Sequence, residues 1–246
     1  FSEGNLEISG GNNTMSTFAP TSGKWYWEVY IDAVSSAGNH IGVMSTDYAK
    51  DSDHYDEFDV IGCRADNYDL TAVGRGQGIT AVGSNTATLA GFVAGDIISF
   101  ELNLDTPQVI INKNDSPIMN RTFTYDNAYP VLPWIRNNSS NISILNCGQD
   151  SSFAGNETAQ GNQDGNSIGD FYYEPPTDFL ALCTSNLSAP EIKLPGENFN
   201  TVLYTGDGAT TLAVTGAGFA PDLTWIKNRS ATDKHVLVDS VRGANQ

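Results

Sequence analysis

The sequence of 246 residues contains 29 acidic and 12 basic side chains, which gives a net charge of −17. This charge excludes nucleic acid as an expected partner, because phosphate contacts need clustered Lys and Arg, and it disfavours an anionic membrane for the same reason. No apolar run approaches the roughly 20 residues of a membrane span, so membrane insertion is not expected. An apolar fraction of 39% is enough for a core, and 24 glycines predict many turns.

The first strong pattern is the alternation of side chains over residues 22–31. One face carries the large apolar side chains of Trp25, Trp27, Val29 and Ile31. The other face carries Lys24, Tyr26, Glu28 and Tyr30. A period of two with aromatic side chains on one face is typical of a half-buried β-strand that lines a sandwich core. We therefore expect Glu28 to lie at the surface.

Further strands are expected along the chain, and no segment has the spacing of a long helix. Residues 97–104 alternate and place Phe100 and Leu102 on an apolar face. The turn at residues 105–107 then returns the chain to a hairpin partner at residues 109–111. Together with Trp25 and Trp27, these two side chains are the predicted core.

Shorter strands are expected at residues 41–44, 60–61 and 141–146. Residues 129–134 contain two prolines, which cannot donate to a sheet ladder, so we expect an edge strand there. The predicted fold class is all-β: an antiparallel β-sandwich.

The composition divides the chain into three parts. Residues 1–153 form the predicted sandwich, and residues 154–176, rich in Gly, Asn and Pro, are expected to be a linker or a surface arm. Residues 177–246 return to a β pattern and are expected to form a smaller C-terminal module. Seventy residues with few core positions are marginal alone, so this module is expected to pack on the sandwich or to continue into further sequence.

Four stretches of the first part resemble the SPRY family, within the concanavalin A-like jelly rolls. They are residues 22–29, residues 40–43, residues 95–105 with 109–114, and residues 128–132 with 147–149. The resemblance implies a protein-binding module that uses the loops at one end of its sandwich. The family has no invariant ligand residues, so it implies no particular site residue here.

The last part resembles a module of virion proteins of tailed phages, marine phages especially. The similar stretches are residues 178–187, 199–206, 219–230 and 239–243. The resemblance implies a structural virion protein that is assembled in the bacterial host cytoplasm. It implies a fibre or appendage subunit, homo-oligomeric and in threefold symmetry as phage fibres often are, whose partners are other virion subunits and a host-surface glycan or protein.

Three alternatives to this function stay open at this stage. A capsid-decorating fibre is the nearest one. A carbohydrate-active enzyme and a free lectin-like protein belong to other classes. The Glu-x-Asp-x-x-Glu strand pattern of concanavalin-like hydrolases is absent, and Glu28 and Glu101 are interpreted as surface residues.

An acidic stretch with aromatic residues is the candidate ligand-binding loop. Its residues are Asp53, His54, Tyr55, Asp56 and Phe58. Aromatic side chains among acids suit a tip that binds sugar or protein. Dense carboxylates could also hold Ca²⁺, but the stretch lacks the Gly and Glu of an EF-hand loop, so a solvated acidic loop is the plainer hypothesis. No metal or other cofactor is predicted.

Other chemical motifs are weak. Residues 165–169 match G-x-S-x-G, but no strand precedes the serine and the later His235 is its only candidate base. Residues 74–78 are glycine-rich without the ending of a phosphate-binding loop. Cys63, Cys147 and Cys183 have no metal-ligand spacing and are expected to be free thiols. We therefore expect no catalytic residue and no enzymatic activity.

Overall fold

The chain forms two compact units, Phe1–Leu187 and Ser188–Gln246, and each is described here by itself. The computed structural model describes residues 6–10, 13–34, 39–45, 59–66, 68–72, 78–137, 140–187 and 194–242. The boundary between the units falls at Leu187, later than the boundary at residue 176 that composition suggests. The segment expected to be a linker or a surface arm therefore belongs to the first unit.

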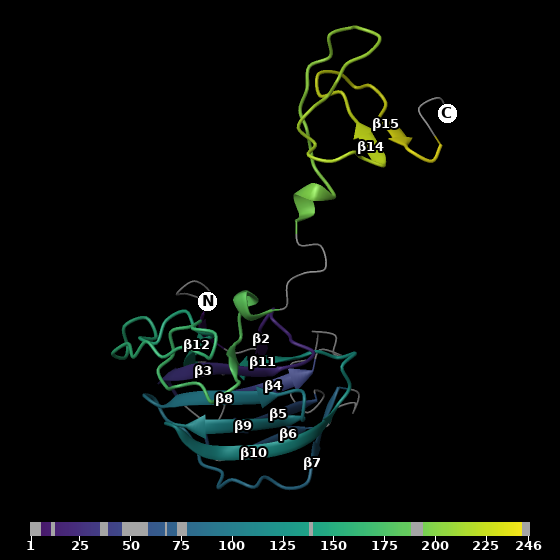
Figure 1. Ribbon diagram of the computed structural model, residues 1–246. Helices are drawn as coiled ribbons and strands as arrows, with labels where there is room; N and C mark the ends of the chain where they lie inside the picture. The colour runs from purple at the N-terminus through teal and green to yellow at the C-terminus, as the bar shows by residue number, and fades with distance from the viewer. Residues whose placement is uncertain are drawn as a thin grey trace. The chain divides into compact units, whose positions relative to one another are not determined.

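The first unit is a sandwich of two β-sheets (Figure 1). The larger sheet has the strand order β1 (Glu7–Ser9), β12 (Ile142–Asn146), β3 (Lys24–Ala33), β8 (Ile97–Asn103), β9 (Gln108–Lys113), β10 (Ser116–Tyr125) and β7 (Ile79–Val82), and β13 (Leu180–Ala181) pairs with β3. The smaller sheet has the order β2 (Asn13–Met15), β11 (Val131–Arg136), β4 (His40–Ser45), β5 (Val60–Arg64) and β6 (Tyr68–Ala72). All these pairs are antiparallel except the parallel pair of β13 with β3. The all-β sandwich predicted from the alternation is confirmed.

The core lies between the sheets and contains the side chains that the alternation places on one face. Trp27 of β3 and Phe100 of β8 are cross-strand partners, and their rings stack with centroids 4.9 Å apart. Trp25 and Leu102 form the neighbouring pair of the same ladder. All four side chains are at most 6% exposed. Their burial removes several hundred Å² of apolar surface from water and is the main stabilising contribution at this position.

The outer face of β3 is also buried, which the alternation did not predict. Residues 147–187, the covering segment, pass over this face (Figure 1). Phe153 stacks on Tyr30 with ring centroids 5.4 Å apart, and Phe171 meets Tyr26 edge to face at 5.0 Å. Glu28 lies between the two tyrosines and has no exposed surface. The interpretation of Glu28 as a surface residue is therefore wrong, because the covering segment takes the place of solvent.

Polar side chains hold the turns of the covering segment. Asn146 Oδ1 accepts the backbone N–H groups of Gly148 and Gln149 at 2.8 and 3.0 Å, which turns the chain after β12. Asp164 accepts N–H groups of the following turn and also that of Ala181 in β13, at 2.8 Å. Asparagine and aspartate thus satisfy backbone donors that no sheet ladder reaches.

Strand β11 is flanked on both sides, and its prediction as an edge strand is wrong in this respect. It pairs with β4 over its full length and with β2 over Trp134–Arg136. Pro133 lies just outside the ladder with β2, and its carbonyl accepts the Ser16 N–H at 3.1 Å. Because the nitrogen and carbonyl of one strand residue point to the same side, the proline nitrogen faces the place where β2 has ended.

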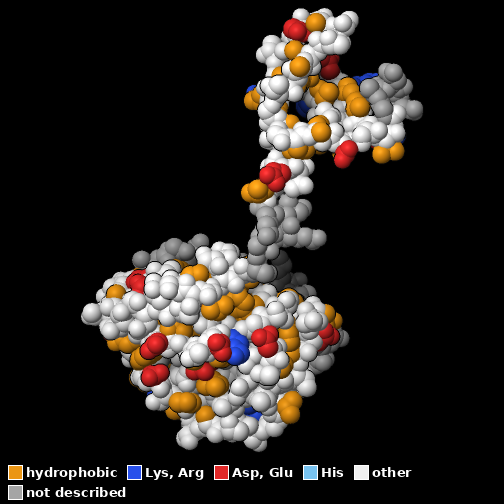
Figure 2. Space-filling view, in the orientation of Figure 1, with side chains coloured by type: hydrophobic (Ala, Val, Ile, Leu, Met, Phe, Trp, Pro, Cys, Tyr) orange, Lys and Arg blue, Asp and Glu red, His pale blue; other side chains and the backbone are white. Residues whose placement is uncertain are grey.

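The C-terminal unit contains a hairpin of two strands, β14 (Leu223–Ile226) and β15 (Val236–Asp239). The hairpin agrees with the β pattern expected of residues 177–246. The rest of its described residues form turns and irregular segments, with one short 3₁₀ turn at Pro195–Glu197. None of its described residues is buried, and Figure 2 shows apolar side chains on the surface of this unit.

Candidate binding site

Several connections of the sandwich meet at one end of the first unit. The Asp126 N–H donates to the Gly78 carbonyl at 3.0 Å, and the Val131 N–H donates to the Pro20 carbonyl at 3.3 Å. The Ser45 N–H donates to the Asp59 carbonyl at 3.2 Å. We call this the loop end, formed by residues 20–22, 45, 59, 78, 104–107 and 125–130.

The connections at the loop end are packed tightly at their base. A Cβ at Gly78 would lie 2.1 Å from Ser45 Oγ, so only glycine fits at this approach. Asp59 is 1% exposed, and its Oδ2 accepts the Gly78 N–H at 3.2 Å. These contacts fix the residues at which the connections leave the sheets. The connections therefore have a rigid support.

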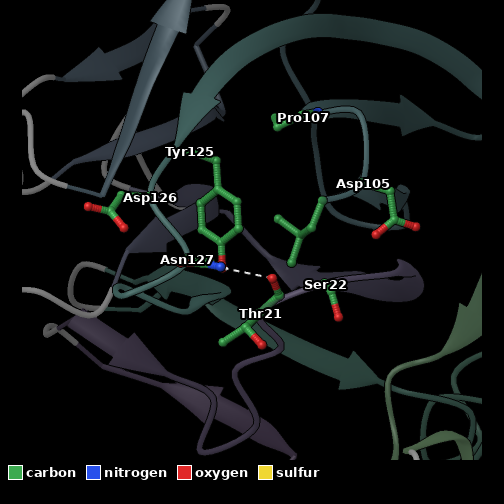
Figure 3. A pocket seen from close by; sticks show the side chains of 8 residues that line it. Thr21, Ser22, Asp105, Pro107, Tyr125, Asp126 and Asn127 are labelled. Atoms are coloured by element: carbon green, nitrogen blue, oxygen red, sulfur yellow. Dashed lines mark hydrogen bonds between the residues drawn. The ribbon is translucent and has the colours of Figure 1, made fainter.

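A shallow, open pocket of about 540 Å³ lies at the loop end (Figure 3). Its lining residues come from three connections: Thr21, Ser22, Leu104, Asp105, Pro107, Tyr125, Asp126 and Asn127. In Figure 3 the ring of Tyr125 points toward Thr21, with Asp105 and Asp126 on opposite sides of it. Apolar surface from the proline and the tyrosine ring is thus surrounded by polar groups, which suits recognition of a glycan or a polypeptide segment.

Tyr125 is the residue that connects the two sides of the pocket. Its hydroxyl donates to the Thr21 carbonyl at 3.2 Å, and its ring meets Phe123 edge to face at 6.5 Å. Burial, assisted by the negative charge of Asp126, raises the pKa of Tyr125 above its ordinary value. The phenol therefore remains a protonated donor in neutral solution.

The pocket has acidic groups and no basic one among its lining residues. Asp105 Oδ1 accepts the Gly23 N–H at 2.8 Å, and Asp126 Oδ1 accepts the Ala128 N–H at 3.0 Å. Both side chains are exposed. Asp105 therefore joins its turn to the connection before β3, and Asp126 stabilises its own turn. Both carboxylates also present negative charge to a bound ligand.

The described residues on either side of the candidate ligand-binding loop belong to the loop end. The loop's own residues Asp53, His54, Tyr55, Asp56 and Phe58 lie outside the described residues. The described flanks on either side of it are Ser45 and Asp59, which are joined by the backbone hydrogen bond given above. Asp59, the acidic residue that follows this loop, is buried in the loop base. The other carboxylates on which the Ca²⁺ hypothesis depends lie outside the described residues: Asp47, Asp51, Asp53, Asp56 and Glu57.

The lining residues of the pocket were not singled out from the sequence. The turn at residues 105–107 was predicted, but its meeting with residues 20–22 and 125–127 depends on the strand order of the larger sheet. A sequence pattern gives the strands and not the order in which they pair. Only the SPRY resemblance, which implies use of the loops at one end, pointed toward such a site.

Glu28 forms a second polar centre, beneath the covering segment. Its Oε1 accepts the Tyr26 hydroxyl at 3.0 Å and the Tyr173 N–H at 2.8 Å. Its Oε2 accepts the Tyr172 N–H at 2.9 Å and Asn146 Nδ2 at 3.1 Å. Burial raises the pKa of Glu28, although the four hydrogen bonds oppose the shift. This arrangement fixes the covering segment to β3 and leaves no room for a substrate.

The weaker motifs have structural roles. In the G-x-S-x-G stretch, the Ser167 N–H donates to the Asp164 carbonyl at 2.9 Å within a tight turn. His235 lies in the C-terminal unit, where its Nδ1 accepts Trp225 Nε1–H at 2.8 Å. Cys63 is buried, and Cys147 and Cys183 are half-buried, all as free thiols. Glu101 is half-buried and accepts Asn112 Nδ2 at 2.8 Å.

Among the described residues, no helix has the length and hydropathy needed to cross a membrane. The same residues contain no group of three or more His, Cys, Asp or Glu side chains arranged to hold a metal ion.

Residues 24–150 match the SPRY domain family, which is more than half of the chain. The chain belongs to the SPRY family. The predicted SPRY-like sandwich is thereby confirmed, and the loop end described above is an end of a SPRY sandwich. Residues 194–246 match a domain of unknown function, DUF7483. No curated protein matches the chain.

Solved SPRY structures are similar to this chain over part of its length. The crystal structure of the SPRY domain of human HERC1 is 20% identical, with a TM-score of 0.43, and the match covers 59% of this chain and 90% of that one. A human SPRY domain is 17% identical, with a TM-score of 0.41, over 57% and 91% of the two chains. The TRIM65 PSpry domain is 10% identical, with a TM-score of 0.38, over 58% and 82%.

Proposed function

We propose that this chain is a structural subunit of a tailed-phage virion, located in a fibre or appendage, and that its SPRY sandwich binds a host-surface glycan or protein or docks on neighbouring subunits. The observation that carries the binding role is the open pocket at the loop end, set on tightly packed loop bases. The resemblance of the C-terminal module to virion proteins supports the location.

Binding in this proposal depends on a surface that is formed before the partner arrives. The hydrogen bond from Tyr125 to Thr21 and the backbone contact of Ser45 with Asp59 hold the connections together through groups of the chain itself. A preformed surface loses little conformational freedom on binding, which favours affinity. Weak contacts repeated over the copies in an appendage add avidity, so each single contact can stay modest.

The charge of the first unit limits the partners that fit. Residues 1–187 contain 23 acidic and 7 basic side chains, a net of −16. A neutral glycan or a basic protein surface meets the loop end without repulsion, whereas an anionic polymer does not. The excess of acidic residues also fits a virion in a medium of high salt, where the repulsion is screened over a few Å.

Location is tested by gold-labelled antibody against the first unit, applied to intact virions from the phage that encodes the chain. Label on fibres or other appendages is expected. Label on the capsid surface would identify the protein as a capsid-decorating fibre. The absence of label from virions would overturn the virion role.

Binding is tested by competition, with purified full-length chain added before phage adsorption. The chain is expected to lower adsorption, and Asp126→Asn together with Pro107→Ala is expected to weaken this effect. Asp115→Asn is the matched control. Asp115 is exposed in the β9–β10 turn, which lies at the end of the sandwich opposite the β8–β9 turn. Equal loss in the control would show that charge alone, and not the pocket, matters.

Turnover of surface polysaccharides provides the test against an enzyme. The full-length chain is expected to release no product from host polysaccharide. Any turnover that one Asp or Glu substitution abolishes would replace the binding role by a carbohydrate-active enzyme.

A further inference from the structure

The C-terminal unit exposes its apolar side chains. None of the described residues 194–242 is buried. Its large exposed apolar side chains are Leu194, Phe199, Leu203, Tyr204, Leu212, Val214, Leu223, Trp225, Ile226, Val236, Leu237 and Val241. Monomeric proteins rarely expose so many large apolar groups in so short a segment, and such surfaces mark contacts with other molecules.

The hairpin of this unit concentrates these side chains on its faces. Trp225 and Leu237 are cross-strand partners and therefore lie on the same face, with exposed fractions of 67% and 56%. Leu223 lies on that face as well, because it is two residues from Trp225. A two-stranded hairpin is at best marginally stable alone in water, so it needs a surface to cover one face.

The net charge of the C-terminal unit distinguishes between the molecules that could cover this face. Residues 188–246 contain 6 acidic and 5 basic side chains, a net of −1, against −16 for residues 1–187. Nucleic acid and anionic membranes attract surfaces with a large basic excess, which this unit lacks. Two copies of a nearly neutral unit meet without net repulsion. Its basic residues, such as Lys227 and Arg229, also stand near acidic ones, such as Asp222 and Asp233, in the sequence, so a self-complementary contact can pair opposite charges.

We propose that the C-terminal unit is the association surface of the chain, and that its occupant is the same unit of other copies. The face with Leu223, Trp225 and Leu237 is buried in this contact. The inference deepens the proposed function, because it assigns the homo-oligomer of the appendage to a defined surface. It also assigns the contact between copies to the C-terminal unit, whose net charge of −1 does not oppose association.

The test is the mass of the full-length chain in solution, measured by sedimentation equilibrium over a range of concentrations. Wild-type chain is expected at a multiple of its 26.4 kDa. Raising NaCl from about 0.1 M to about 1 M shortens the Debye length from about 10 Å to about 3 Å. Association is therefore expected to strengthen with salt, because the repulsion between the first units is screened while apolar contacts persist.

Leu237→Asp is expected to raise the concentration needed for assembly at least about tenfold, since it buries an unpaired carboxylate in the contact. Leu223→Asp tests the same face independently. Val82→Asp is the matched control, because Val82 is 50% exposed on the first unit against 56% for Leu237. Leu223 and Leu237 are exposed within the C-terminal unit and Val82 is exposed within the first unit, so the variants are expected to fold.

A chain that stays at 26.4 kDa at both salt concentrations would overturn the inference. So would assembly that survives Leu237→Asp and Leu223→Asp, or that Val82→Asp disrupts. Co-sedimentation of a single chain with phosphatidylcholine vesicles would identify a lipid surface as the occupant instead. If the chain is monomeric in solution but the antibody still labels virion appendages, this inference fails and the proposed function stands. If the chain is oligomeric but absent from virions, the proposed function fails and this inference stands.

Discussion

The two units of this chain differ in whether they bury their apolar side chains. In the SPRY sandwich, β3 is buried on both faces, between the sheets and beneath the covering segment. In the C-terminal unit no described residue is buried. The difference shows that strand patterns alone do not make a core, because a strand also needs a second layer against which to pack.

The net charges of the two units differ as well. The unit that buries its own apolar surface has a net charge of −16, and the unit that exposes it has −1. A strongly charged surface keeps identical molecules apart, whereas a nearly neutral apolar surface allows them to associate. Under the two proposals above, the sandwich presents the binding end and the C-terminal unit gathers the copies.

The largest contrast is expected between two tryptophans. Trp27→Ala removes a ring that is 1% exposed and stacked on Phe100, and it is expected to lower the free energy of unfolding by about 3–5 kcal/mol. Trp225→Ala, at a position 67% exposed, is expected to change the unfolding of the sandwich by less than about 0.5 kcal/mol. Urea denaturation followed by circular dichroism measures both. Equal losses would contradict the division into a unit with a core and a unit without one.

Removal of the buried carboxylate is expected to have the next largest effect. Glu28→Ala leaves the N–H groups of Tyr172 and Tyr173 without their acceptor and is expected to cost about 2–3 kcal/mol. Hydrogen exchange of these two amides is expected to accelerate more than that of amides in β9. Glu197→Ala is the matched control, since Glu197 is exposed in the C-terminal unit. Unchanged exchange at Tyr172 and Tyr173 would mean that other contacts hold the covering segment.

The sandwich was predictable because its strands alternate strongly. The period-two pattern around Trp25 and Trp27, and the turn between β8 and β9, follow from local chemistry that a sequence displays. The boundary of the unit was not predictable in this way. Residues 154–166 contain no large apolar side chain, and their fold depends on side-chain to backbone hydrogen bonds such as those of Asp164.

The burial of Glu28 and the pocket at the loop end were hidden for a related reason. Glu28 occupies the polar face of an alternating strand, where solvent is the normal neighbour. Its burial follows from the backbone of residues 172–173, which lies 144 positions away in the sequence. The pocket likewise joins Thr21 with Tyr125 over 104 positions. Contacts at such separations depend on topology, which periodicity does not encode.

Two glycines provide a smaller contrast between the units. Gly169 has φ +107°, and a Cβ there would lie 2.5 Å from Phe171 Cε2. Gly169→Ala is therefore expected to destabilise the sandwich by about 2 kcal/mol, since it combines backbone strain with a clash against a packed ring. Gly208→Ala also has positive φ but meets nothing within 4 Å, and it is expected to leave sandwich unfolding unchanged. Thermal unfolding distinguishes the two, and a larger loss for Gly208→Ala would contradict the contrast.

The smallest effect is expected from pH, and it too depends on the covered face of β3. Burial raises the pKa of Glu28 above its ordinary value of 4.5. Between 4.5 and the raised pKa the folded chain holds more of this proton than the unfolded chain, so the free energy of unfolding falls as the pH rises through that interval. The slope from one group is below about 1.4 kcal/mol per pH unit. Glu28→Gln does not titrate and is expected to lose this slope.

The comparison of wild type with Glu28→Gln separates this slope from those of other carboxyl groups. Burial alone would raise the pKa of Asp164, but hydrogen bonds from Ala181, Ile168, Asn186 and Asn166 hold it below its ordinary value of 3.8. Its contribution is therefore present above pH 3.8 and is lost as the pH falls through the lowered pKa, equally in both proteins. Urea denaturation at a series of pH values from about 4.5 to about 7 gives the difference. Parallel curves for the two proteins would show that the pKa of Glu28 is the same in the folded and the unfolded chain. The covering segment would then stabilise the charge of this carboxylate as well as water does.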